Sequence, residues 1–118
     1  MYRSQTSIAN EHDFDTTFTA EIDANQTDVA LITPTSGKLI KVTGIYISTE
    51  GATSAGQKIR LKFNTSDNTI CTFFSTTTPA SLPMPDIVVR GARNEVLSIT
   101  SDLGADKNYF IVVNYKEE

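Results

Sequence analysis

The sequence contains a single cysteine, Cys71, and a single histidine, His12, and it has no tryptophan. One cysteine forms no disulfide within the chain, and one cysteine with one histidine gives too few ligands for a zinc site. His12 lies in a polar stretch without apolar periodicity, where no cleft would hold it as a catalytic base. We therefore predict that the protein is not an enzyme and that it binds no metal or cofactor.

Positive charge and long apolar runs are also scarce. The chain has 10 Lys and Arg residues against 14 Asp and Glu residues, which gives a formal net charge of −4. A protein that coats nucleic acid needs a dominating positive field, so this balance argues against that role. No apolar stretch approaches the ~18 residues of a membrane-spanning helix. Neither nucleic acid nor a membrane is expected as a partner.

Helical periodicity is absent as well, since no stretch places apolar residues at i, i+3, i+4 and i+7 behind a helix cap. The sequence instead has short runs rich in Thr, Ile and Val between turn residues. Eight strands are expected, at residues 14–22, 28–33, 38–49, 58–63, 69–76, 86–90, 95–100 and 108–115. This spacing predicts an all-β fold, an antiparallel β-sandwich of jelly-roll-like type.

The strictest alternation lies in residues 58–63. The basic residues Lys58, Arg60 and Lys62 alternate with the apolar residues Ile59, Leu61 and Phe63. A period of two is typical of a strand with one buried face. We predict that the apolar set lies in the core and that the basic set faces outward, with a hairpin over residues 58–76.

The strand expected at residues 38–49 changes parity midway. Ile40 and Val42 share one face, but Ile45 and Ile47 fall on the other, and Gly44 sits at the change. Two interpretations fit this pattern. One extra residue in a bulge at Gly44 would return both pairs to the core. A strand buried on both faces would produce the same sequence.

Two later segments have opposite characters. Residues 77–85 contain three prolines in seven residues, which excludes pairing as a central strand and predicts a long crossover between sheets. Residues 109–115 are so apolar that an exposed sheet edge there would invite aggregation. We expect this last strand to be central and paired on both sides.

The chain is expected to form an extended N-terminal arm, residues 1–13, and one β-sandwich domain, residues 14–118. Acidic residues dominate between positions 11 and 28, and basic residues dominate between positions 38 and 62. These segments fit two solvated faces that favour solubility, or complementary patches that meet between neighbouring subunits. The sequence leaves both possibilities open.

Other binding chemistry is weakly indicated. Calcium could take oxygens from Asp102 and Asp106, or from Asp13 and Asp15, but neither pair offers a full ligand set, and turn formation explains them more simply. Carbohydrate stacking would need exposed aromatic rings. The candidates are Tyr2, Tyr46, Tyr109 and Tyr115, and the last three lie inside apolar strands, where core or sheet-surface positions are expected.

Two stretches, "GKLIKVTGIYISTEGATSAGQKIRLKF" and "IVVRGARNEVLSITSDLGADKNYFIVVNY", resemble small β-sandwich virion proteins of tailed bacteriophages, especially capsid decoration proteins and head or tail accessory proteins. The matching positions are Gly37, Ile40, Val42, Gly44, Ile45 and Ile47, then Gly91, Asn94, Leu97, Ile99, Val113 and Tyr115. The resemblance spans roughly residues 37–115. It implies a non-enzymatic protein that binds and stabilises an assembled capsid or tail, often as a symmetric trimer.

The resemblance also sets the expected partners and place of action. The partners are the major capsid protein or other virion proteins and further copies of the chain, and the location is the virion, assembled in the host cytoplasm. Possible interface residues are Tyr2, Arg3, Ile8, Lys58, Arg60 and Lys62. The alternative function is a glycan- or receptor-binding β-sandwich module.

Overall fold

The computed structural model describes residues 15–23, 25–64, 68–104 and 107–118. These residues form nine strands: β1 Thr16–Ile22, β2 Asn25–Ile32, β3 Ile40–Thr49, β4 Gln57–Phe63, β5 Asn68–Ser75, β6 Ala80–Met84, β7 Val89–Arg90, β8 Leu97–Asp102 and β9 Tyr109–Glu117. Within the described ranges there is no helix, and thus none long and apolar enough to cross a membrane.

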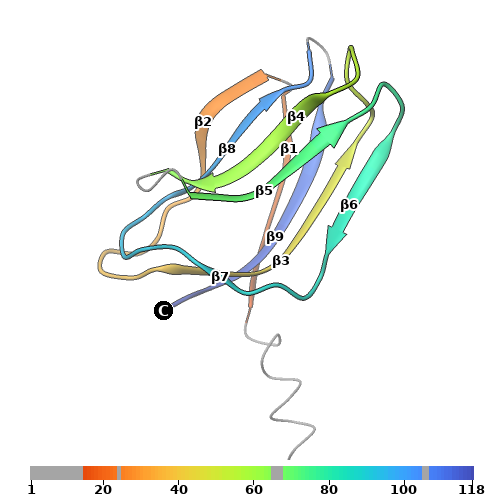
Figure 1. Cartoon of the computed structure of the whole chain (residues 1–118). Coiled ribbons are helices and arrows are strands. Elements are labelled where there is room, and N and C mark those ends of the chain that lie inside the picture. The colour runs from red at the N-terminus through yellow and green to blue at the C-terminus, as the bar shows by residue number, and fades with distance from the viewer. Residues whose placement is uncertain (1–14, 24, 65–67, 105–106) are drawn as a thin grey trace, which may run out of the picture.

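The strands form two antiparallel sheets that pack face to face (Figure 1). One sheet has the order β1-β9-β3-β6, with the short β7 also paired to β3. The other has the order β2-β8-β4-β5. The expected all-β antiparallel sandwich is confirmed, and the chain passes between the sheets repeatedly as it runs from β1 to β9.

The core lies between the sheets and is built from aliphatic side chains of both. Ile59, Leu61 and Phe63 of β4 are completely buried, as the alternation of that segment predicts. The predicted hairpin is also present, because β4 pairs antiparallel with β5. Opposite them, β3 and β9 contribute six further residues with almost no exposed surface: Ile40, Val42, Ile45, Ile47, Ile111 and Val113.

A bulge in β3 explains how residues of both parities enter the core. The register with β9 shifts between Val42 and Gly44, which leaves Thr43 as the extra residue. Beyond the shift, Ile45 and Ile47 are buried, whereas Ser48, on the opposite face of the strand, is exposed. The bulge is therefore present, and the first part of the strand, from Ile40 to Ile45, is also buried on both faces, with Lys41 and Thr43 among its buried residues.

The last strand is central, as predicted. β9 pairs with β1 on one side and with β3 on the other, in antiparallel register along both. Its core-facing side chains lie at 109, 111 and 113, so their burial depends on both neighbours. The most apolar segment of the chain is thereby removed from any sheet edge.

Three expectations about strand boundaries are wrong. Residues 77–85 do cross between sheets, but they also contain strand β6, which pairs with β3. An edge strand is bonded along one side only, so Pro83 can occupy it despite lacking an N–H. β2 begins at Asn25, inside a stretch expected to be a turn, and only Val89–Arg90 of the expected strand 86–90 is a strand.

Candidate interaction surface

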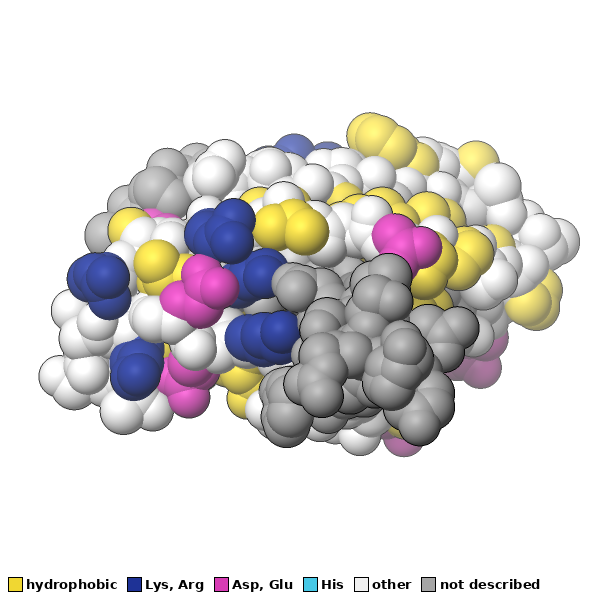
Figure 2. Space-filling model, turned by 90° about the horizontal axis from the view of Figure 1, so that it is seen from below, with side chains coloured by type: hydrophobic (Ala, Val, Ile, Leu, Met, Phe, Trp, Pro, Cys, Tyr) yellow, Lys and Arg dark blue, Asp and Glu magenta, His cyan; other side chains and the backbone are white. Residues whose placement is uncertain are grey.

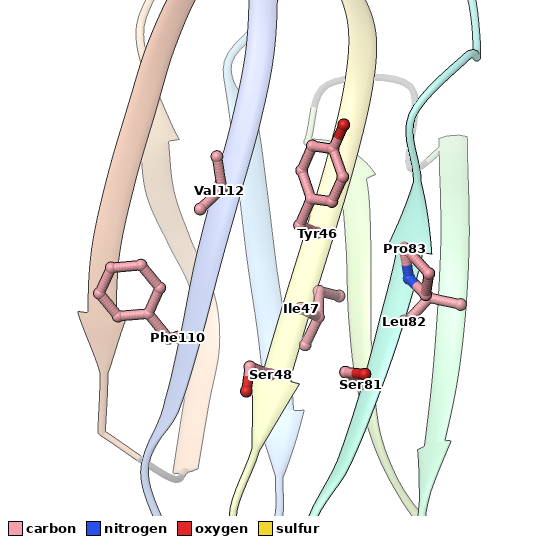
Figure 3. Close-up of a pocket in the computed structure, with 8 residues that line it drawn as sticks. All are labelled: Tyr46, Ile47, Ser48, Ser81, Leu82, Pro83, Phe110 and Val112. Carbon is pink, nitrogen blue, oxygen red and sulfur yellow. The ribbon is translucent and has the colours of Figure 1, made fainter.

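The outer face of the β1-β9-β3-β6 sheet carries an ordered set of apolar and small side chains. Residue pairing aligns Val112, Tyr46 and Pro83 in one row across β9, β3 and β6. The next row holds Phe110, Ser48 and Ser81 in the same order. Figure 3 shows these two rows side by side on the sheet. The alternation of strand side chains places all six on the face away from the core.

The serine pair creates a hollow in this surface, which we call the apolar groove: Tyr46, Ser48, Ser81, Pro83, Phe110 and Val112. Serine is small, so the ring of Phe110 and the side chains of the neighbouring row stand above the sheet around it. The hollow measures about 240 Å³, and Phe110 is 46% exposed. Pockets for small molecules are commonly larger, about 300–1,000 Å³. The groove therefore suits shallow contact with another surface.

The groove continues toward the start of β9 into a second, more open hollow of about 340 Å³. Ser48 and Phe110 border both hollows, while Glu21 and Glu50 add carboxylates at this end. The backbone N–H of Asn108 donates to Oε1 of Glu50 at 3.2 Å, which fixes that carboxylate against the loop before β9. The sheet face thus changes from apolar to acidic along its length.

The predicted basic residues lie on the opposite face of the molecule. In the register of β4 with β5, Lys58 lies opposite Phe74 and Arg60 lies opposite Thr72, both on the outer side of the β2-β8-β4-β5 sheet. Lys62 shares their parity but is held close to the sheet, with 13% of its side chain exposed. The structure aligns all three as the sequence predicts, although none is fully exposed.

Lys62 is part of a polar cluster with Asp28 and Thr100. Its Nζ lies 2.8 Å from Oδ1 of Asp28, and the hydroxyl of Thr100 donates to the same oxygen at 3.0 Å. These hydrogen bonds, from Lys62 first and from Thr100 second, lower the pKa of Asp28. One contact between the acidic and basic segments therefore forms within a single chain, and does not require a neighbouring subunit.

Lys58 and Arg60 border a small hollow of about 180 Å³ together with Thr100, Ser101 and Asp102. The backbone N–H of Lys58 donates to Oδ1 of Asp102 at 2.7 Å, so a carboxylate already lies at its edge. Among the described residues, the buried Nε of Arg60 has no hydrogen-bond partner. The hollow carries both signs of charge, which favours polar contact over binding of a simple anion.

Three predicted interface residues, Tyr2, Arg3 and Ile8, lie outside the described residues, as do the rest of segment 1–13 and His12. The described chain begins next to the β3 bulge, where the hydroxyl of Thr43 donates to Asp15. Nζ of Lys116 lies 3.6 Å from the same carboxylate. These two contacts hold Asp15 against β3 and β9.

The lower end of the sandwich mixes acidic and basic side chains (Figure 2). Nε of Arg90 donates to Oε1 of Glu118 at 2.9 Å, and Nζ of Lys41 lies 3.8 Å from its other oxygen. The hydrogen bond from Arg90 is the main cause of a lowered pKa of Glu118. Because these charges compensate one another, this end does not present a field of one sign.

The aromatic candidates for carbohydrate contact separate into different environments. Tyr46 borders the apolar groove, whereas Tyr109 is buried and donates its hydroxyl to Oγ of Ser101 across the core at 3.0 Å. Burial raises the pKa of Tyr109 to about 12, although the bond to Ser101 acts in the opposite direction. Tyr115 packs partly against the core, as does Cys71 in β5. Tyr2 lies outside the described residues.

The calcium candidates do not assemble a site in the part of the chain that the structure describes. No group of three or more potential ligands occurs among these residues. Asp102 accepts the bond from Lys58, and Asp15 binds Thr43. Asp13 and Asp106 lie outside the described residues.

Sequence reasoning missed most of the apolar groove. Its members lie on strands whose pairing brings together Tyr46, Pro83 and Phe110, positions far apart in the sequence. A signal was nevertheless present in β9, because Phe110 and Val112 are apolar on the parity opposite to the core residues. That pattern shows an apolar residue on the outer face, but not which neighbours surround it.

No protein-family profile and no curated protein matches the chain. Several solved structures are similar to the chain. A chain in the acidic stable capsid structure of Helicobacter pylori bacteriophage KHP30 is similar over 91% of this chain and 93% of that chain, with a TM-score of 0.62 and 13% identity. The globular domain of zebrafish complement 1qA protein is similar over 83% of this chain and 94% of that chain, with a TM-score of 0.49 and 15% identity. At such identities the likeness concerns the fold.

Proposed function

We propose that this chain is a non-enzymatic virion protein of a tailed bacteriophage. It binds and stabilises either an assembled capsid, as a decoration or cement protein, or a tail. The observation that carries the proposal is the fold likeness to a chain of the KHP30 capsid structure, which extends over nine-tenths of both chains. The resemblance of residues 37–115 to small phage virion proteins supports it from the sequence. The proposed location is the virion, assembled in the host cytoplasm.

The strand order supports assigning the sandwich to the jelly rolls. Strands β1, β3, β6 and β9 lie in one sheet, and β2, β4, β5 and β8 lie in the other, and apart from the β4–β5 hairpin the neighbours are distant in sequence. Such interleaving is what two nested Greek keys produce, and double-sheet jelly rolls occur in viral capsid domains.

The proposed binding mode is shallow and repeated. The apolar groove supplies aromatic and aliphatic surface, and the row of Lys58, Arg60 and Lys62 supplies polar contact on the other face. The arm residues Tyr2, Arg3 and Ile8 add a third contact in the proposal. The oligomer that the resemblance implies is a trimer, and three linked copies can raise avidity by about 10²–10⁴ over one copy.

The first test deletes the gene from the phage and then adds the purified protein back to the particles. Particles should be purified from a host that carries the phage genome with this gene deleted, and labelled protein should then be added back. We expect the label to co-sediment with the particles and to raise their resistance to heat or chelation. The proposal fails if wild-type particles lack the protein and the added protein never co-sediments.

A second test locates the contact. Phe110→Ser and Tyr46→Ser should weaken co-sedimentation, because each removes apolar surface from the groove. Val88→Ser is the matched control, since Val88 is 61% exposed but lies outside the groove. Equal retention of all three variants would exclude the groove while leaving the function itself open.

A glycan-binding module is the second candidate, and one observation favours it. Tyr46 and Phe110 lie on the same sheet face, with Ser48 next to both rings and Ser81 beyond Ser48 on β6. Aromatic surface beside hydroxyl groups can stack on a sugar ring and bond its hydroxyls. Chitohexaose and maltoheptaose are suitable probes, with the signals of the Tyr46 ring followed by NMR. Saturable shifts that Tyr46→Ser abolishes would favour this function.

A further inference from the structure

The four sheet edges of the sandwich differ in how they are protected against pairing with another strand. An edge strand presents unpaired N–H and C=O groups, and natural proteins block such edges with charge, proline, bulges or short length. Within the described residues, β1, β6, β2 and β5 are each paired along one side only. Comparing their protection indicates which edge is left available.

Three of the edges carry obstacles. β6 has only five residues and contains Pro83, which has no N–H to donate. β2 has two irregularities in its register, and Asp28 adopts a positive φ of 48° within the first of them. β1 carries the exposed carboxylate of Glu21. Each feature disfavours the addition of a further strand.

β5 lacks most of these protections. Its sequence, NTICTFFS, has eight residues with no charge and no proline, and it is rich in strand-forming types. One register shift, which makes Ile70 the extra residue, interrupts its first half, and from Cys71 to Ser75 the pairing with β4 is regular. Phe74, on the outer face of this regular part, is 64% exposed, more than any other large apolar side chain described.

We propose that the free edge of β5 pairs antiparallel with β5 of a second copy of this chain, across a two-fold axis near residues 72–74. The two four-stranded sheets would then form one continuous sheet. Pairing satisfies the edge N–H and C=O groups, and it brings Phe74 of each copy against the partner strand.

The absence of charge along β5 favours a second copy as the partner. A two-fold contact places the residues close to the axis near their own equivalents, so a charge there would meet like charge, and β5 carries none between 68 and 75. The basic row on β4 lies one strand inward in each copy. The two rows would be three strand spacings apart, about 14 Å, which exceeds the Debye length of about 8 Å at physiological salt.

This contact is compatible with the proposed function and does not depend on it. On a shell the copies would be concentrated at one surface, and a two-fold contact could join neighbouring trimers if trimers form. The pairing is tested on the purified protein alone, so its failure is distinct from failure to bind particles.

The experiment uses charge exchange at Thr72, which lies opposite Arg60 on the outer face of β5. We expect sedimentation equilibrium at high protein concentration to give a mass for the wild-type protein that is twice the mass of Thr72→Lys or of Thr72→Glu. In either variant, like charges would face each other across the axis. An equimolar mixture of both variants should associate again, because each pair would then carry opposite charges.

Thr19→Lys is the matched control, since Thr19 is an exposed outer-face threonine on the edge strand β1. It should leave the mass unchanged. Hydrogen exchange gives a second readout, in which amides of residues 71–75 become more protected as concentration rises and amides of β1 do not. The proposal is overturned if wild-type protein has the same mass as Thr72→Lys at all concentrations, or if Thr19→Lys dissociates it equally.

Discussion

The ring of Phe63 packs directly against the backbone of Gly91. A Cβ atom added at Gly91 would lie 2.6 Å from Cε1 of Phe63, which is closer than carbon atoms tolerate. Gly91 also donates its N–H to the carbonyl of Ile40 at 3.0 Å, so its backbone cannot retreat without breaking that bond. The glycine is required here by the close approach of an aromatic ring to the backbone.

We predict that Gly91→Ala lowers the free energy of unfolding by about 1–3 kcal/mol, because the new methyl group overpacks the site. The same substitution should cost less in a Phe63→Leu background, where the clashing ring atoms are gone. Phe63→Ala alone should cost about 3–5 kcal/mol, because it empties a fully buried position. Urea denaturation of the double-mutant cycle measures the coupling, and equal costs in both backgrounds would contradict the contact.

The Asp28 cluster predicts a pH dependence of stability. Hydrogen bonds from Lys62 and Thr100 hold the pKa of Asp28 below its ordinary value of 3.8 in the folded state. A lowered folded pKa contributes stability above the unfolded pKa, and that stability is lost as pH falls through the folded value. Wild-type protein should therefore lose more stability than Asp28→Asn between neutral pH and about pH 3.

Asp28→Asn is a fair reference for this measurement, because asparagine tolerates the positive φ of 48° at this position. Chemical denaturation at a series of pH values gives the two profiles. Parallel profiles for both proteins would show that the ion pair contributes nothing to folding.

At the scale of the element, the bulge in β3 illustrates what sequence reasoning can reach. The parity change around Gly44 is local, and only two strand arrangements explain it. The sequence therefore limits the conformation of β3 to a bulge or a strand buried on both faces. The strict alternation in β4 was likewise sufficient, because burial of one face determines both sets of side chains. Both features depend on neighbouring residues of one segment.

Deletion of Thr43 should test the bulge. Without Thr43 the strand would alternate regularly, so Ile45 and Ile47 would stay on the core face and Gly44 would keep its pairing with Asn114. We expect this variant to keep a cooperative unfolding transition in thermal melts monitored by circular dichroism. Deletion of Tyr46 is the contrast and should abolish the transition, because it reverses the alternation and turns Ile47 away from the core. Loss of the transition in the Thr43 deletion variant would contradict the assignment of Thr43 as the extra residue.

Features that depend on pairing between distant strands were not predictable. The segment containing Pro83 was expected to lack a strand, because the sequence did not show that its pairing position was an edge. The apolar groove required the register of β6, β3 and β9 together, which no local pattern encodes. The contact of Lys62 with Asp28 required knowledge that β8 lies between β2 and β4.

At the scale of the whole molecule, the surface charges are arranged to compensate locally. Lys62 meets Asp28, Arg90 meets Glu118, and Lys116 lies near Asp15. Exposed ion pairs typically contribute about 0.2–1 kcal/mol and are screened by salt. Under the proposed function, persistent attachment to a particle should then depend more on apolar contacts and on segment 1–13 than on the basic row.

We predict that deletion of residues 1–13 weakens retention on purified particles more than the double reversal Lys58→Glu with Arg60→Glu. Lys62 is left unchanged, because its reversal would place two carboxylates together at Asp28. The effect of the reversal should also vanish at high salt, whereas the effect of the deletion should persist. Co-sedimentation at two salt concentrations measures both effects. The reverse order of effects would assign the contact to the basic row.

The central position of β9 has a consequence for how the protein is made. β1 and β3 do not pair with each other, because β9 lies between them and pairs with both. On the ribosome, both strands emerge early and must keep an apolar face and an open edge until β9 has been translated. Folds that depend on such distant pairings form slowly, in about milliseconds to seconds. Nascent chains of this protein are therefore expected to need chaperone protection during synthesis and to fold only after β9 has left the exit tunnel.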